Sequence, residues 1–121
     1  MAEAMDMSPI DIMTYLNSLC AVDIPPTVET VDDLKEASKL LGHCAGLYSY
    51  LINMQMTAKV MKRQYKRSGK DKEKVEDALV REEIFGNYAE IIKTAYNAVS
   101  RMVTIKQQVN SELRMLGDNL G

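Results

Sequence analysis

Apolar residues recur at helical spacing along two long stretches of this chain of 121 residues. In each stretch they alternate at spacings of three and four, the repeat of a helix that packs along a partner helix. The first seam consists of Ala37, Leu40, Cys44, Leu47, Leu51, Met54, Ala58, Met61 and Tyr65. The second seam consists of Ile84, Tyr88, Ile91, Ala95, Ala98, Met102, Ile105 and Val109, and continues less regularly through Leu113 and Leu116. The pattern predicts two long helices that meet along these seams.

A shorter helix is expected before the two long ones. Ser8-Pro9-Ile10-Asp11 offers an N-cap serine, a proline in the first helical position and an acidic residue in the first turn. These features are typical of a helix start, so the sequence predicts a helix over residues 8–20. Asp23-Ile24-Pro25-Pro26 then interrupts the chain, because proline restricts both its own backbone and that of the residue before it.

The ends of the long helices are also marked. Thr30 and Asp33 have the spacing of a capping box, and Ser68-Gly69 follows a basic last turn, which predicts a helix over residues 30–68. The chain restarts near Asp71, and we expect the third helix over residues 71–117. Gly86-Asn87 is a position where this helix can kink or separate from a short leading segment.

These elements predict an all-α fold in a single domain, residues 1–121, with a short N-terminal helix followed by a long antiparallel helical hairpin. The hairpin arms are on the order of 50 Å long at 1.5 Å per residue. A first helix of about a dozen residues cannot cover arms of that length, so we expect the protein to form a homo-oligomer. The predicted oligomer interface comprises Gly42, Gly46, Leu47 and Leu51. Gly42 and Gly46 are four residues apart, which would let another backbone approach closely, although they can also be a tolerated pair of small residues.

The run from Leu40 to Ala58 carries no formal charge at neutral pH, but it contains the polar residues His43, Ser49, Asn53, Gln55 and Thr57. A membrane span is more uniformly apolar, so we interpret this run as a helix buried in protein, either within one subunit or between several. No basic segment followed by an apolar run marks a signal peptide. With two cysteines, too few for a disulfide framework, we expect a cytoplasmic protein, in a host cell if a phage encodes it.

Charge is distributed unevenly along the chain. Residues 59–74 hold eight of the fifteen basic residues against Asp71 and Glu73, although the whole chain has a net charge of −2. Such a dense block of one sign is typical of a surface that meets phosphate or an acidic partner. The block contributes Lys59, Lys62, Arg63, Lys66, Arg67 and Lys70 to the predicted nucleic-acid-binding site. Tyr65 lies within it and suits stacking on unpaired bases, or else belongs to the first apolar seam.

Nothing in the sequence indicates catalysis. His43 is the only histidine, and no metal-binding spacing or glycine-rich phosphate loop is present, so we expect no metal and no cofactor. The adjacent carboxylates at residues 32–33 and 82–83 do not face each other on a helix and are explained as solvated helix faces. We therefore expect a protein that is not an enzyme.

Two cations of the third helix complete the predicted binding site. Arg101 and Lys106 lie on the polar side of the second seam among uncharged polar residues. Such a stretch can line a groove for a phosphate backbone, or it can be an ordinary solvated helix face.

Ser100-Arg101-Met102-Val103-Thr104-Ile105-Lys106, followed by Leu113-Arg114, resembles the Ser-Arg-x-x-x-Ile-Lys element near the C-terminus of phage UvsY-type recombination mediators. The basic turn with Arg63, Ser68 and Gly69 is similar to the basic turn of that family. The resemblance covers roughly residues 58–116. The segment between the two elements is shorter here, and Tyr65 does not coincide with the family's aromatic pair.

The resemblance implies a helical protein that assembles into a ring-like oligomer and binds single-stranded DNA. It also implies partners, because such mediators help a RecA-like recombinase displace single-strand-binding protein and form its filament. The matching positions are Arg63, Ser68, Gly69, Arg101 and Lys106.

Two other functions fit the sequence. The first is a small helical phage protein that binds and inhibits or modulates a host protein through its basic region. The second is an assembly coiled coil, in which the basic region contacts the acidic end of another subunit. Tight binding to an acidic protein without nucleic-acid binding would indicate the first, and salt-induced dissociation of subunits would indicate the second.

Overall fold

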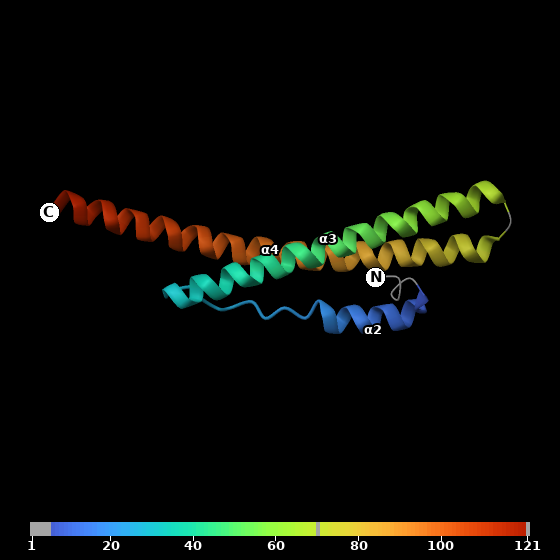
Figure 1. Ribbon diagram of the computed structural model, residues 1–121, viewed down its shortest axis with the longest axis horizontal. Coiled ribbons are helices and arrows are strands. Elements are labelled where there is room, and N and C mark those ends of the chain that lie inside the picture. The colour runs from blue at the N-terminus through green and yellow to red at the C-terminus, as the bar shows by residue number, and fades with distance from the viewer. Residues whose placement is uncertain (1–5, 70, 121) are drawn as a thin grey trace.

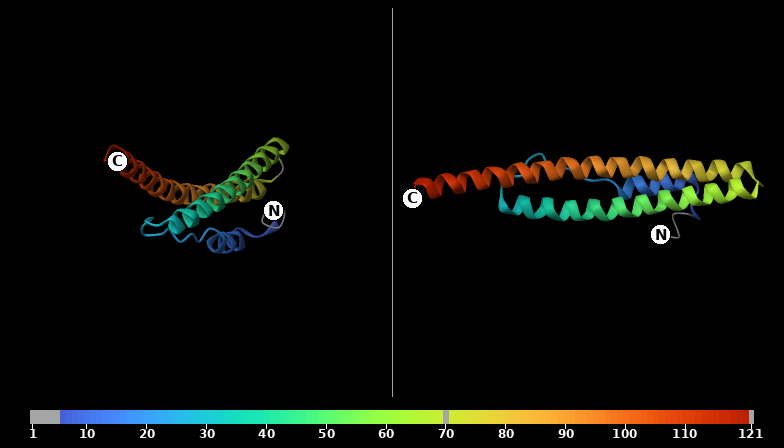
Figure 2. Two further views of the ribbon diagram at one scale, coloured as in Figure 1. Left: turned by 60° about the vertical axis from the view of Figure 1, so that its left-hand side comes forward. Right: turned by 90° about the horizontal axis from the view of Figure 1, so that it is seen from above.

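A computed structural model of the protein describes residues 6–69 and 71–120, with side-chain surroundings given through residue 117. The described residues contain three helices and no strand: α2 (Pro9–Leu19), α3 (Val31–Ser68) and α4 (Lys72–Leu120). The helices α3 and α4 pack against each other as an antiparallel hairpin, and α2 lies along one side of it (Figure 1, Figure 2). The predicted all-α fold with a long helical hairpin is confirmed.

The helix starts use the predicted caps. The Ser8 side chain accepts a hydrogen bond from the Asp11 backbone N–H at 3.2 Å, with Pro9 in the first helical turn. At the start of α3, Thr30 Oγ1 accepts from the Asp33 N–H, and Asp33 Oδ2 accepts from the Thr30 and Glu29 N–H groups, each at 3.0 Å. The capping box is confirmed, and it satisfies N–H groups that have no partner within the helix.

The same hydrogen bonds set the acidity of Asp33. Donation by the backbone N–H groups of Glu29 and Thr30 stabilises the carboxylate and lowers the pKa of Asp33 below its ordinary value. The cap therefore contributes stability above the pKa that this carboxyl has in the unfolded chain. That contribution is lost as the pH falls through the lower folded-state pKa.

The main core lies where α2 covers the hairpin. Its fully buried side chains include Leu51 of α3, Phe85 and Ile92 of α4, and Ile12 and Leu16 of α2. Tyr88 of α4 also fixes α2, because its hydroxyl donates to the Met13 carbonyl at 3.4 Å and to the Asn17 side chain. Burial of these side chains is what holds α2 in place, since it is too short to be a stable helix alone.

A second, smaller core lies near the start of α3. Here Val28 of the extended connector and Ala37 of α3 pack with Val99 and Val103 of α4. Val103 is the last buried residue of α4 among those whose side chains are described. Beyond it α4 continues without α3 beside it (Figure 1, Figure 2). We call residues 104–117 the tail of α4.

The first predicted seam is the buried face of α3. Six of its nine members are buried and the other three are half-buried. The segment from Leu40 to Ala58 therefore packs within one chain. Leu47 and Leu51 belong to the main core, so the contacts expected for them with another subunit are made inside the chain. Gly42 and Gly46 are exposed with open space around them, and their place in an oligomer interface stays a prediction.

The second predicted seam is only partly the buried face of α4. Its members Ile84 and Ala95 are buried and Tyr88, Ala98 and Met102 are half-buried, but Ile91, Ile105 and Val109 are exposed. The buried line of α4 runs through Phe85, Ala89, Ile92, Ala95, Val99 and Val103. The helix carries two neighbouring apolar stripes at helical spacing, and only one of them can face α3. Periodicity identifies a helix but does not say which of two apolar stripes meets the partner.

The helix α4 passes through Gly86-Asn87 as one element. A side chain at Gly86 would come within 2.6 Å of Gln55 Nε2 on α3, so glycine here makes room for that amide group. The glycine thus serves close helix packing and does not end the helix. No helix in the described part of the chain is long and apolar enough to cross a membrane.

Two adjacent isoleucines test the corrected phase of α4. Ile92 is fully buried and Ile91 is 55% exposed. Ile92→Ala should lower the free energy of unfolding by about 2–5 kcal/mol, because it leaves a cavity in the main core. Ile91→Ala removes the same atoms from a surface position and should change it by about 1 kcal/mol or less. Urea unfolding followed by circular dichroism measures both. A larger loss of unfolding free energy for Ile91→Ala than for Ile92→Ala would mean that Ile91 faces α3, as the sequence pattern predicted.

Candidate nucleic-acid interface

The basic region lies at the tip of the hairpin, where α3 turns into α4. Gly69 ends α3 in the left-handed conformation, with φ 65° and ψ 13°, and its N–H donates to the Lys66 carbonyl at 3.2 Å. Asp71 starts α4, because its Oδ1 accepts from the Glu73 N–H at 3.0 Å. This short turn places the basic end of α3 beside the first turns of α4. Lys70, a predicted binding residue, lies outside the described residues.

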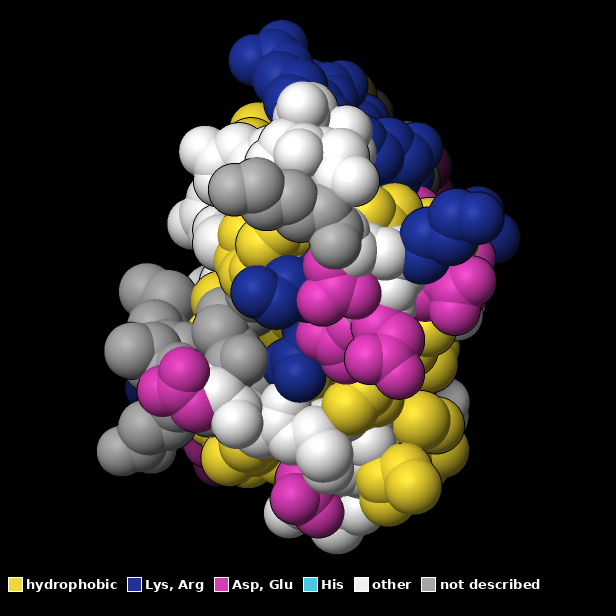
Figure 3. Space-filling model, turned by 90° about the vertical axis from the view of Figure 1, so that its right-hand side faces the viewer, with side chains coloured by type: hydrophobic (Ala, Val, Ile, Leu, Met, Phe, Trp, Pro, Cys, Tyr) yellow, Lys and Arg dark blue, Asp and Glu magenta, His cyan; other side chains and the backbone are white. Residues whose placement is uncertain are grey.

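Four predicted binding residues share one exposed face of α3. We call this the basic face: Lys59, Arg63, Lys66 and Arg67. The buried Ala58 and half-buried Met61 point to α4 from the other side of the same helix. None of the ion pairs in the described part of the chain involves these four side chains. In Figure 3 the basic side chains gather over the α3 side of the tip.

Lys62 is placed differently from the other lysines of α3. Its Nζ lies 2.6 Å from Glu82 Oε2 on α4, and the two side chains are only 17% and 16% exposed. The pair joins the two arms of the hairpin in a partly desolvated setting, where Coulomb attraction is screened less than at the surface. The structure thus gives Lys62 a carboxylate partner within the chain, in place of a phosphate.

Beyond the turn, at the start of α4, basic side chains are mixed with acidic ones. Asp71, Glu73, Glu76 and Asp77 occupy the start of α4 together with Lys72 and Lys74. Figure 3 shows acidic side chains directly beside the basic ones at the tip. The Lys74 Nζ lies 5.7 Å from the centre of the Tyr65 ring, within the range of a cation–π contact. Among the described residues of the tip, the basic face is therefore the surface where cations gather without acidic neighbours in the sequence.

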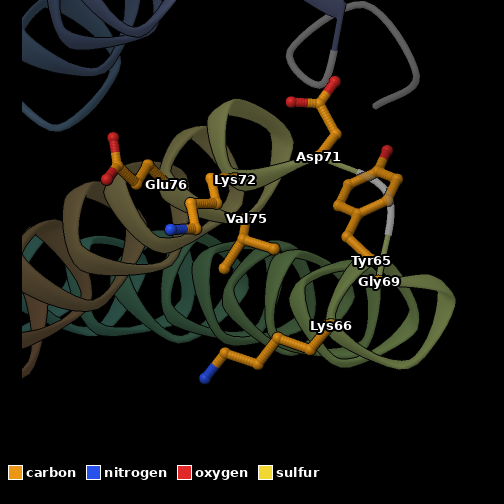
Figure 4. A pocket seen from close by; sticks show the side chains of 7 residues that line it. All are labelled: Tyr65, Lys66, Gly69, Asp71, Lys72, Val75 and Glu76. Atoms are coloured by element: carbon orange, nitrogen blue, oxygen red, sulfur yellow. The ribbon is translucent and has the colours of Figure 1, made fainter.

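A cavity of about 360 Å³ opens at the tip between the two helices. Its lining consists of Tyr65, Lys66, Gly69, Asp71, Lys72, Val75 and Glu76 (Figure 4). The Lys66 side chain points away from α4, whereas Val75 points toward α3. Two basic and two acidic residues balance one another around it, so the cavity has no net charge to select an anion. Tyr65 is half-buried in its wall and keeps part of its ring accessible.

Arg101 and Lys106 are not part of the tip. Arg101 lies nineteen residues beyond Glu82, the partner of Lys62, which is roughly 30 Å further along α4 at 1.5 Å per residue. Arg101 is exposed, and the charge of Lys106 helps to lower the pKa of Asp33 at the start of α3. One chain therefore presents two separate sets of cations.

Two features near the basic face were missed by the sequence analysis. Met56 and Val60 are 59% and 49% exposed on the same side of α3 as Arg63 and Arg67. Together with Met61 and two polar residues they line a shallow groove of about 440 Å³. The spacing of four between Met56 and Val60 is visible in the sequence, but both residues lie off the first seam, where apolar residues are easily passed over. The basic face therefore has an apolar border.

Reactive groups elsewhere in the structure are shielded. Cys20 and Cys44 are free and buried, and burial raises the pKa of each thiol, which disfavours the reactive thiolate. Burial also raises the pKa of Tyr50. Within the described residues no group of three histidine, cysteine or acidic side chains could hold a metal ion.

Comparison with models of known protein families, with curated proteins and with solved structures finds no match to this chain. Its function is therefore inferred from the surface of the molecule and from the short elements described above.

The ion pair between the hairpin arms gives a testable prediction. Glu82→Gln should lower the free energy of unfolding by about 1–2 kcal/mol, because the Lys62 ammonium group then stays partly buried without a counterion. The matched control is Glu36→Gln, which removes the partner of Lys39 from a pair whose side chains are 77% and 75% exposed. We expect a change within about 0.5 kcal/mol for the control. Equal effects in thermal unfolding would mean that Lys62–Glu82 does not brace the hairpin.

Proposed function

We propose that this protein binds single-stranded DNA through the basic face of α3 and acts as a recombination mediator. The observation that carries the proposal is the basic face itself. Four cations project from consecutive turns of one helix, all exposed and without an ion-pair partner in the described structure. A row of unpaired cations on a rigid helix neutralises phosphates and releases their counterions, which is the main source of affinity for a nucleic-acid backbone.

Favourable interaction with the helix dipole explains only two of the four cations of the basic face. Lys66 and Arg67 lie in the last turn of α3, where cations interact favourably with the helix dipole. Lys59 and Arg63 lie further from the helix end, beyond the range in which that interaction matters. These two residues favour a role in binding, because they stabilise nothing that the described contacts show.

The apolar border of the basic face favours a single strand over a duplex. Met56 and Val60 lie next to the cations, where unstacked bases can make contact. Proteins that bind single strands combine a basic track for the backbone with apolar or aromatic surface for the bases. In a duplex the bases are already stacked and would not use this surface.

The role as a mediator rests on the resemblance of residues 100–106 and of the basic turn to UvsY-type proteins. In that role the protein would hold the strand in a form that a RecA-like recombinase takes over from single-strand-binding protein. Arg101 and Lys106 would then contact the same strand at a second place on the molecule. No covalent chemistry is required of any residue.

A second candidate function is the binding of an acidic host protein. The groove beside Met56 and Val60, bordered by Arg63 and Arg67, fits an amphipathic segment with acidic and apolar residues. Such a protein would bind its partner tightly and nucleic acid negligibly, so one titration separates the two functions.

The test removes three cations from the basic face. For R63Q/K66Q/R67Q we expect weaker binding to a labelled single-stranded oligonucleotide and a slope of log affinity against log salt that falls by about 2. The expected change follows from about 0.7 per phosphate contact on a single strand. Fluorescence anisotropy across a range of NaCl concentrations measures both quantities, with a duplex of the same length beside it.

The matched control is K35Q/K39Q/K93Q, which removes the same charge from exposed positions away from the basic face. Its salt slope should stay close to that of the unmodified protein. If both triple variants lose the same affinity, binding follows net charge and the assigned face is wrong. If the unmodified protein does not bind a single strand at low salt, the proposed function fails and the binding of an acidic protein takes its place.

A further inference from the structure

The tail of α4 carries an apolar stripe that, beyond Met102, no other described part of the chain covers. The stripe begins at the half-buried Met102 and continues through four exposed side chains. We call it the tail stripe: Met102, Ile105, Val109, Leu113 and Leu116. No residue of the tail is buried, and the helix runs on alone past the start of α3 (Figure 1).

We propose that the tail stripe is a self-association site at which the tail of a second copy packs antiparallel, with Val109 against Val109. The chemistry of the tail favours a second copy over a charged partner. Among residues 104–117 the only charged side chains are Lys106, Glu112 and Arg114. A segment with a net charge of +1 and both signs can approach its own copy with little repulsion.

The spacing of the stripe favours the antiparallel direction. Its members are separated by three, four, four and three residues, a pattern that reads the same in both directions about Val109. In an antiparallel pair with Val109 at the centre, Ile105 lies level with Leu113 of the second copy, and Met102 with Leu116 of the second copy. Each apolar layer is therefore filled from both chains.

The charged side chains beside the tail stripe also fit an antiparallel pair. Glu112 borders the tail stripe next to Leu113. The antiparallel pair puts Glu112 on the same flank as Arg101 of the second copy, about 7.5 Å along the axis at 1.5 Å per residue. Both side chains are exposed in the single chain. Two symmetric pairs of opposite charge then border the apolar layers.

The interface between the two tails would be small. Ten large apolar side chains, five from each copy, form an interface below the standard size of stable protein complexes. We expect a weak dimer, which forms and separates as the protein concentration changes.

If the protein binds a single strand as proposed, the antiparallel pairing sets the distance between the two basic faces of the dimer. Lys72 at the hairpin tip is 37 residues from Val109, or roughly 55 Å along α4. An antiparallel dimer therefore holds its two basic faces at opposite ends, on the order of 110 Å apart. Long single strands can then bind both ends of one dimer, whereas short oligonucleotides bind one.

Analytical ultracentrifugation of the protein without nucleic acid tests the association. Leu113 and Met115 are exposed to nearly the same extent, 61% and 62%, but only Leu113 belongs to the tail stripe. Leu113→Glu should raise the dissociation constant of the dimer at least tenfold, whereas Met115→Glu should change it by no more than about twofold. The proposal is overturned if the unmodified protein is monomeric at several hundred micromolar, or if the two variants behave alike.

Cysteine pairing tests the direction. We would mix Ile105→Cys and Leu113→Cys proteins of different mass and oxidise them, with the unmodified protein as the control for its own buried cysteines. The antiparallel pair predicts that the mixed disulfide dominates. Predominant pairing of each variant with itself would show a parallel pair and overturn the proposal.

Dimerisation through the tail and binding of a single strand can be tested separately. The dimer is measured without DNA, so it stands or falls independently of strand binding. If both hold, Leu113→Glu should weaken binding to strands long enough to span about 110 Å and leave the affinity for a short oligonucleotide unchanged. A protein that dimerises but binds no strand would remove the proposed function alone.

Discussion

The structure depends on one line of side-chain packing between two long helices. The buried face of α3, centred on Leu51, lies against Phe85 and Ile92 of α4, and the short helix α2 closes this layer with Ile12 and Leu16. Apart from the smaller core near the start of α3, the described surfaces of both helices outside this layer face outward. The chain therefore has two places where its outward surfaces are chemically unusual, the basic face at one end and the tail at the other.

The two ends differ in what they can bind. At the hairpin tip, the Lys62–Glu82 ion pair joins the arms, while the four cations of the basic face remain without carboxylate partners in the described structure. At the other end, α4 continues past Val103 with an apolar stripe and few charges. One end suits a phosphate backbone and the other suits a second copy of the same helix. A protein with a charged binding end and an apolar association end can gather several weak contacts with one strand.

Much of this fold could be predicted from the sequence, because its local signals agree with its packing. Ser8 and Thr30 cap the helices as expected, and the first seam is the buried face of α3. The second seam was only partly right, for a physical reason. On α4 the stripe of Ile91, Ile105 and Val109 is as regular as the buried line of Phe85, Ile92 and Val99, and only contact with α3 distinguishes them. The basic run was visible, but the separation of Lys62 from its neighbours depends on Glu82, which lies twenty residues away.

The most direct test of the account is a lysine-acetylation footprint of the protein with and without a saturating single-stranded oligonucleotide, read by mass spectrometry. Lys59 and Lys66 on the basic face should be protected by the strand, while the exposed Lys93 in the middle of α4 should be acetylated to the same extent in both samples. Unchanged acetylation of Lys59 and Lys66 in the presence of the strand would contradict the assignment of α3 as the binding surface.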